Sequence, residues 1–302
     1  MNRSALVASV ALVALFSVHR ASARTGPTVI PLGTYLGVLP SVQVRFGGRE
    51  HTMLLDTGGG LTVVTPATAA AIDCRPWGRL TGFRMRGDRV DMSRFDRVKV
   101  TLAGLAVRVP EVGVWDFGKV LPKNAPPLAG SIALDAFSRR VVTLDLADRR
   151  LIVETRASLA ARLRREHAVA VPMRFEREVD GESLEPLIGI DTLRGRVWME
   201  IDSGSDGDVI VNRPLAHALG LDPADKRAQQ MAVSIGGVFP LRAPARMMNL
   251  VIDGDIGEPV LRHWIITIDL AHRRMWLAPA TPTDAATSAP SHRRSRWAGL
   301  TD

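Results

Sequence analysis

Short apolar segments recur along the chain, separated by glycine, proline and charged residues. They contain mostly Val, Ile and Leu, in runs of the length and composition that are typical of β-strands. Examples are TVIPL, VQVRF, VKVTLAGLAVRV, AVPMRF, RVWMEI, DVIV and MAVSIGGVF. The pattern predicts a mainly β protein with a few short helices.

Two segments depart from this pattern and predict helices. RASLAARLRREHA at 156–168 places Leu159 and Leu163 four residues apart on one face, among charged positions. PLAHALGL at 214–221 predicts a second, shorter helix. The first of these helices lies between two similar halves of the sequence and marks the boundary between them.

Three sequence patterns occur twice, in the same order. LLDTGGG at 54–60 and MEIDSGS at 199–205 each place Asp-(Thr/Ser)-Gly behind a short apolar run. AGSIALDAF and DGDIGEPVL follow, and then RRVVTLDLADRRLIVE and RHWIITIDLAHRRMWLAP, which match almost position for position. This last pair predicts a β-hairpin that closes each half, with turns near Asp148-Arg149 and His272-Arg273. The chain is therefore predicted to consist of two copies of one unit.

The two ends of the chain differ from the rest. MNR is basic, ALVASVALVALFSV is apolar but short for a membrane span, and Ala21-Ser22-Ala23 is typical of a signal-peptide cleavage site. We therefore expect export to the periplasm or the medium, with a retained membrane anchor as the alternative. The predicted parts are a signal peptide at 1–23, an N-terminal lobe at 24–157, a helical linker at 158–168, a C-terminal lobe at 169–279 and a disordered basic tail at 280–302.

Composition limits the classes of function. The 302 residues suffice for two domains, and 46% apolar with 23% charged residues fits a globular core. The net charge of +8 comes from scattered arginines without a zinc-finger or base-stacking pattern, so no nucleic-acid partner is predicted. Cys74 is the single cysteine, which excludes an intrachain disulfide, and the seven histidines lack metal-binding spacing. No metal, cofactor or stable membrane span is predicted.

The doubled Asp-(Thr/Ser)-Gly motif has a chemical meaning of its own. A carboxylate at the end of a buried strand, followed by a hydroxyl and a glycine, lies on a tight turn. Two such loops, one per half, can face each other across a pseudo-two-fold axis. Carboxyl groups at hydrogen-bonding distance share one proton, so one can activate a water while the other donates to a carbonyl. Alternatives based on Ser203 as a nucleophile or on a calcium loop lack the residues that those sites require.

These three duplicated elements carry a resemblance to a known family. Over residues 30–279 the sequence resembles the aspartic proteases of the pepsin and retropepsin superfamily, and most of all bacterial retropepsin-like proteins with both repeats in one chain. The resemblance implies a mainly β, bilobal acid-protease fold, with two pseudo-two-fold related, barrel-like lobes. It implies that Ser131-Ile132-Ala133 and Asp255-Ile256-Gly257 pack behind the catalytic loops.

The resemblance also implies roles for individual residues. The catalytic pair would be Asp56 and Asp202, supported by Thr57, Gly58, Ser203 and Gly204. A hairpin flap over the substrate would come from SIGGVFP, with Ser234, Gly236 and Gly237, and its weaker counterpart from TGFRMRG, with Gly82. The sequence departs from the family at Gly59 and Ala133, and the single tyrosine, Tyr35, precedes the first motif, so no pepsin-type flap tyrosine is present.

The predicted function is that of an exported aspartic endopeptidase acting on peptides or unfolded proteins. The two lobes would pair within one monomeric chain, although pairing with a second chain is an alternative. A different function on the same fold is also open, namely a catalytically silent protein that binds peptides or the cell envelope. Loss of cleavage on replacement of Asp56 or Asp202 by Asn would distinguish the enzyme from the binding protein.

Overall fold

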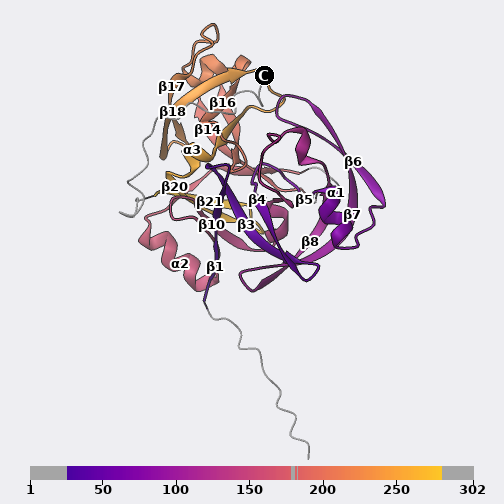
Figure 1. Cartoon of the computed structure of the whole chain (residues 1–302). Coiled ribbons are helices and arrows are strands. Elements are labelled where there is room, and N and C mark those ends of the chain that lie inside the picture. Colours follow the sequence, from indigo (N-terminus) through magenta and orange to yellow (C-terminus); the bar gives the residue numbers. More distant parts are fainter. Residues whose placement is uncertain (1–25, 178–180, 182, 281–302) are drawn as a thin grey trace, which may run out of the picture.

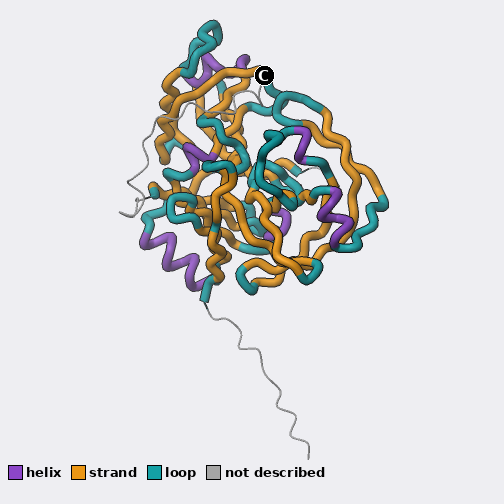
Figure 2. Tube along the Cα trace, in the orientation of Figure 1, coloured by secondary structure: helices purple, strands orange, loops and turns teal. Residues whose placement is uncertain are grey.

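The computed structural model describes residues 26–177, 181 and 183–280 (Figure 1). Strands dominate these residues and the helices are short (Figure 2), which confirms the mainly β prediction. The predicted signal peptide and all but the first residue of the predicted tail lie outside the described residues. Within them, no helix is both long and apolar enough to span a bilayer.

An eight-stranded sheet forms most of the N-terminal half. Its strand order is β2-β3-β4-β9-β5-β8-β7-β6. The strands are β2 Gly33–Tyr35, β3 Leu39–Phe46, β4 Arg49–Leu55, β5 Val63–Val64, β6 Gly78–Phe83, β7 Arg89–Leu102, β8 Leu105–Val114 and β9 Gly130–Ile132. The helices are α1 Pro66–Ala71, η1 Phe117–Lys119 and η2 Leu134–Phe137. Helix α1 begins after Thr65, whose side chain accepts a hydrogen bond from the Thr68 amide.

A seven-stranded sheet forms most of the C-terminal half. Its order is β13-β14-β15-β19-β16-β18-β17. The strands are β13 Met173–Glu176, β14 Glu185–Thr192, β15 Gly195–Asp202, β16 Val209–Asn212, β17 Gln229–Ile235, β18 Phe239–Met248 and β19 Gly254–Gly257. The helices are α3 Glu258–Leu261 and η4 Arg213–Leu219. The helix predicted over 214–221 is thus a 3₁₀-helix that ends at Gly220, which has a φ of 75°.

A third sheet takes strands from both halves and joins them. Its order is β1-β11-β10-β20-β21-β12. The strands are β1 Thr28–Pro31, β10 Val141–Asp145, β11 Arg150–Val153, β12 Val169–Val171, β20 Trp264–Asp269 and β21 Arg274–Pro279. Strands β10 and β20 pair antiparallel at its centre, where the hydroxyl oxygens of Thr143 and Thr267 lie 3.0 Å apart. The two halves therefore pair with each other inside one chain.

The two predicted closing hairpins are both present. Strand β10 pairs with β11 and β20 with β21, and the turns contain Arg149 and Arg273 with φ of 51° and 55°. The predicted helix at the boundary is also present as α2 Arg156–Arg165, capped by Thr155. The exact bounds of the predicted lobes and linker stay a prediction.

The same local topology occurs in each half, as the sequence repeat predicts. In the N-terminal half β4 runs parallel to β9, β9 antiparallel to β5, and β5 parallel to β8. In the C-terminal half β15, β19, β16 and β18 repeat this order of pairings. Figure 1 shows the two halves as separate lobes, indigo to purple and pink to orange. The apolar residues of these strands face inward and build the core.

Candidate functional site at the paired carboxyl groups

The two motif loops begin where buried parallel strands end. Leu55 is the last residue of β4 and pairs with Ile132 of β9, and the Asp56 amide donates to the Ile132 carbonyl at 3.0 Å. In the other half, Asp202 is the last residue of β15 and pairs with Gly257 of β19. Each aspartate therefore emerges from a rigid, two-strand support rather than from a free loop.

Hydroxyl side chains connect the two loops across the boundary between the halves. Thr57 Oγ1 donates to the Ile201 carbonyl at 2.6 Å, and Ser203 Oγ donates to the Leu55 carbonyl at 2.7 Å. In return, the Ser203 amide donates to Thr57 Oγ1 at 2.9 Å and the Thr57 amide to Ser203 Oγ at 3.1 Å. Both side chains are fully buried. These four hydrogen bonds form a brace that fixes the two loops relative to each other.

The brace brings the predicted pair of carboxyl groups together. Asp56 and Asp202 hydrogen-bond each other through their side chains and are half-buried. Asp202 Oδ1 also accepts from the Gly204 amide at 2.7 Å, and the backbone of Gly59 hydrogen-bonds Asp56. The carboxyl groups are thus held by backbone donors on both sides while part of their surface stays open to solvent.

Glycine is required beside this pair because the carboxyl groups of the opposite half lie against the backbone. A β-carbon on Gly58 would lie 2.5 Å from Cγ of Asp202, and one on Gly204 would lie 2.7 Å from Oδ1 of Asp56. Both distances are shorter than real side chains tolerate. The structure therefore places Asp56, Thr57, Gly58, Asp202, Ser203 and Gly204 in one cluster. The roles assigned to them from the sequence stay a prediction.

Burial raises the pKa of both carboxyl groups. The pKa of Asp202 lies well above its ordinary value, first because of burial and second because of the negative charge of Asp56. The pKa of Asp56 is raised by burial, with smaller contributions from Glu185 and Asp255, while its hydrogen bond with Asp202 lowers it. The pair titrates as a unit, because the loss of one proton makes the other harder to remove.

A second pair of carboxyl groups lies beneath Asp202, and the functional interpretation of the sequence missed it. Glu200 of β15 and Asp255 of β19 are direct register partners, and both are buried. Burial raises the pKa of each well above its ordinary value, followed by the charge of Asp202. Neither carboxylate oxygen of Asp255 has a hydrogen-bond partner of normal geometry in the described residues, although the Ser205 side chain lowers its pKa.

The N-terminal half lacks this second pair. At the matching positions of β4 and β9 it has Leu54 and Ser131, which are also register partners. One sequence feature could have indicated the second pair. MEID at 199–202 has Glu200 where the matching MLLD at 53–56 has Leu54, so an acidic residue stands inside an otherwise apolar strand. The site is therefore more acidic on its C-terminal side than the repeat alone suggests.

The first of the two hairpins proposed as flaps reaches the other half. Gly82 lies in β6 opposite Val90 of β7, and the tip of this hairpin spans 84–88. The Met85 carbonyl accepts a hydrogen bond from the Val251 amide of the C-terminal half at 2.9 Å. This hairpin, called the bridging hairpin below, therefore connects the two halves.

The second hairpin packs on its own half. Ser234 lies in β17, and Gly236 and Gly237 form the turn into β18. The Gly236 amide donates to the Gly189 carbonyl at 3.0 Å, and its α-carbon lies against the ring of Pro172. The hairpin that contacts the other half is thus the one around Gly82, which was the weaker flap candidate in the sequence. A flap function of either hairpin stays a prediction.

The chemical capacity of the cluster follows from its geometry. A proton-sharing pair of carboxyl groups can donate one hydrogen bond and accept several, so it can hold a water molecule or the amide group of a peptide. Within the described residues, no group of His, Cys, Asp and Glu side chains has the arrangement of a metal site. The pair of carboxyl groups is therefore able to hydrogen-bond a polar ligand group.

Comparisons with known proteins give the fold but no family. No protein-family model and no curated protein matches the sequence. Among solved structures, the chain is similar to basic 7S globulin from soybean, with a TM-score of 0.55 and 10% identity over 88% of this chain and 100% of that one. It is also similar to conglutin gamma, a basic 7S globulin from lupine seeds, with a TM-score of 0.53 and 11% identity over 85% of this chain and 95% of that one.

These matches correct two predictions from the sequence. The assignment to the retropepsin-like aspartic proteases has no matching family model, and the similar structures are described as globulins, not as peptidases. That assignment and the prediction of an active endopeptidase are therefore wrong. The physical reason is that the motif determines where the carboxyl groups lie, whereas turnover also depends on their ionisation and on how a substrate is held.

The coarser prediction of fold class holds. The structure is mainly β and similar to the fold of the two basic 7S globulins, with barrel-like sheets in two lobes. The finer description as an acid-protease fold stays a prediction, because identities near 10% show a shared architecture alone. We conclude that this chain shares its two-lobe architecture with basic 7S globulins.

Proposed function

We propose that this protein binds an extended polypeptide segment beside the Asp56–Asp202 pair and does not hydrolyse it. The observation that carries the proposal is the brace of Thr57 and Ser203, which holds two half-buried carboxyl groups in hydrogen-bonding contact at the boundary between the halves. Rigid placement of such groups lowers the entropic cost of binding a polar ligand.

The protonation of the pair suits it to hydrogen bonding with a peptide group. Burial raises the pKa of both Asp56 and Asp202, and the acidic neighbours Glu185 and Asp255 oppose ionisation of Asp56 further. A protonated carboxyl group remains an effective hydrogen-bond donor and acceptor for a peptide group.

The edge of the N-terminal sheet offers a second means of holding an extended chain. Strand β6 is the terminal strand of the eight-stranded sheet, so one side of its backbone has no strand partner among the described residues. An extended peptide can add to such an edge through main-chain hydrogen bonds, which depend little on its sequence. The expected ligand is therefore an unfolded or extended segment rather than a folded domain.

Binding can be measured by fluorescence anisotropy with coumarin-labelled, end-capped peptides that carry no charged side chains. Replacing both aspartates by alanine removes the anchoring hydrogen bonds but leaves the brace of Thr57 and Ser203 intact. We expect the affinity to fall about tenfold or more, since each hydrogen bond contributes about 0.5–1.5 kcal/mol.

The matched control is Asp96→Ala, because Asp96 is an exposed carboxylate on β7. It should bind the peptides as the wild type does. Absence of binding by the wild type, or equal binding by the Asp56→Ala/Asp202→Ala variant, would contradict the proposal.

A further inference from the structure

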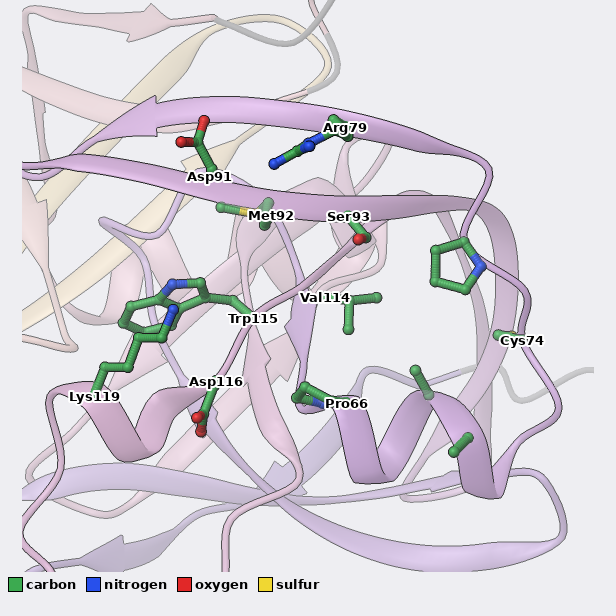
Figure 3. A pocket seen from close by; sticks show the side chains of 13 residues that line it. Pro66, Cys74, Arg79, Asp91, Met92, Ser93, Val114, Trp115, Asp116 and Lys119 are labelled. Carbon is green, nitrogen blue, oxygen red and sulfur yellow. The ribbon is translucent and has the colours of Figure 1, made fainter.

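A pocket of about 480 Å³ lies in the N-terminal half, away from the carboxyl pair. It is an open pocket lined by residues of helix α1, of the β6–β7 hairpin and of the segment that leads from β8 into η1 (Figure 3). None of the residues that line it belongs to the two motif loops. The pocket is thus a separate feature, and its volume falls in the range of small-molecule sites.

Part of the pocket wall is apolar. Met92 of β7, Val114 at the end of β8 and the indole of Trp115 line it (Figure 3). Ala70 of α1 is a further lining residue. The Trp115 amide donates to the Val64 carbonyl at 3.0 Å, and the indole makes an edge contact with the ring of Phe117 at 5.2 Å. These contacts hold Trp115 in place before any ligand arrives.

Two cations lie at the rim without an ion-pair partner. Arg79 of β6 and Lys119 of η1 are exposed, and neither makes a salt bridge within the described part of the chain. In Figure 3 they extend from different elements on the rim of the same pocket. Both side chains therefore keep N–H donors for a ligand, while the charge of Arg79 also acts on Asp91.

The two acids at the rim are already occupied. Asp91 accepts from Arg89 at 2.9 Å and from the Thr81 hydroxyl at 2.6 Å. Asp116 accepts from the Gly118 amide at 2.9 Å as the cap of η1. Because Arg89 is paired with Asp91, the remaining charges at the pocket are those of Arg79, Lys119 and Asp116, which sum to one positive charge.

From these features we propose that the pocket binds a small carboxylic acid with an aromatic or aliphatic body. The body fills the apolar space against Val114 and Trp115, and the carboxylate lies between Arg79 and Lys119. An apolar chamber with a few converging polar groups is the usual design of a small-molecule site. Guanidinium and ammonium groups are the usual partners of a carboxylate. This inference is independent of the proposed function of the carboxyl pair.

The test is calorimetric titration of the full chain with phenylbutyrate and with its neutral analogue phenylbutanol. We expect the wild type to bind the acid at least tenfold more tightly than the alcohol. In Arg79→Gln/Lys119→Gln this preference should disappear because the acid loses its ionic partners, while binding of the alcohol stays unchanged. Ala70→Trp, which places an indole in the pocket from an exposed helix position, should weaken both ligands at least tenfold.

A double variant of matched charge provides the control. Lys99 and Arg108 are exposed register partners on β7 and β8 that do not line the pocket. Lys99→Gln/Arg108→Gln should bind the acid as the wild type does, and circular dichroism will show that all variants fold. No binding of phenylbutyrate by the wild type, or an unchanged preference in Arg79→Gln/Lys119→Gln, would overturn the proposal.

Discussion

Thr57 and Ser203 each supply a hydroxyl group that hydrogen-bonds backbone atoms of the opposite half. Each side chain donates to a carbonyl at the end of the opposite strand and accepts from an opposite amide. These residues could be predicted from the sequence, because they are the hydroxyl residues of the two Asp-(Thr/Ser)-Gly motifs. The buried acids Glu200 and Asp255 were not assigned to the site, because their neighbours come from strands that only the folded sheet brings together.

Removing one hydroxyl should weaken the fold measurably. In Ser203→Ala the Leu55 carbonyl and the Thr57 amide lose their partner inside a fully buried site. We expect the free energy of unfolding to fall by about 1–3 kcal/mol in urea denaturation. Ser234→Ala, at a half-buried serine in β17, is the matched control and should change it by less than about 0.5 kcal/mol. Equal stability of Ser203→Ala and wild type would show that the brace contributes nothing.

The buried acids predict how stability depends on pH. The pKa values of Glu200 and Asp255 are raised by burial, so between the ordinary carboxyl pKa and these raised values the folded chain binds more protons than the unfolded chain. The free energy of unfolding must therefore decrease as pH rises through that window. Below the ordinary carboxyl pKa the two states bind protons equally at these groups, and their stabilising effect is fully present.

Neutral side chains at these positions should remove that pH dependence. In Glu200→Gln/Asp255→Asn we expect a flatter decline of the free energy of unfolding with pH and a more stable protein at neutral pH than the wild type. Urea denaturation across the acidic to neutral range is the measurement. A decline as steep as that of the wild type would assign the pH dependence to other groups.

At the scale of elements, the sequence pattern predicted the hairpins and the helix, whose contacts join residues close together in the chain. Both closing hairpins and helix α2 were expected because their signals lie in one continuous segment. The two-residue strand β5 and the parallel pairing of β4 with β9 were not expected, since they join segments far apart in the chain. For the same reason, the hydrogen bond between Met85 and Val251 could not be predicted, and the 234–240 hairpin was preferred as the flap.

The bridging hairpin should lose its attachment when the donor at Val251 is removed. Val251→Pro lacks the amide that the Met85 carbonyl accepts, so we expect faster hydrogen exchange in residues 84–88. Val251→Ala keeps the amide and should leave exchange in this segment as in the wild type. Unchanged exchange in Val251→Pro would mean that the hairpin is held by other contacts.

At the scale of the whole molecule, the duplication predicted the two-lobe architecture but not the function. The two copies share a six-stranded sheet that joins the halves, and each half contributes one aspartate to the Asp56–Asp202 pair. One architecture can serve different functions, and an identity of 10% to a globulin shows the architecture alone. What the chain does depends on ionisation and ligand access, which the motif does not encode.

Binding without turnover is tested most directly by incubating the full chain with a mixture of denatured proteins at acidic, neutral and mildly alkaline pH. Mass spectrometry then identifies the peptides that stay bound after gel filtration and any new chain ends. The account predicts retained extended segments and no new ends above those produced by Asp56→Asn. New ends that form with the wild type and disappear in Asp56→Asn would contradict it.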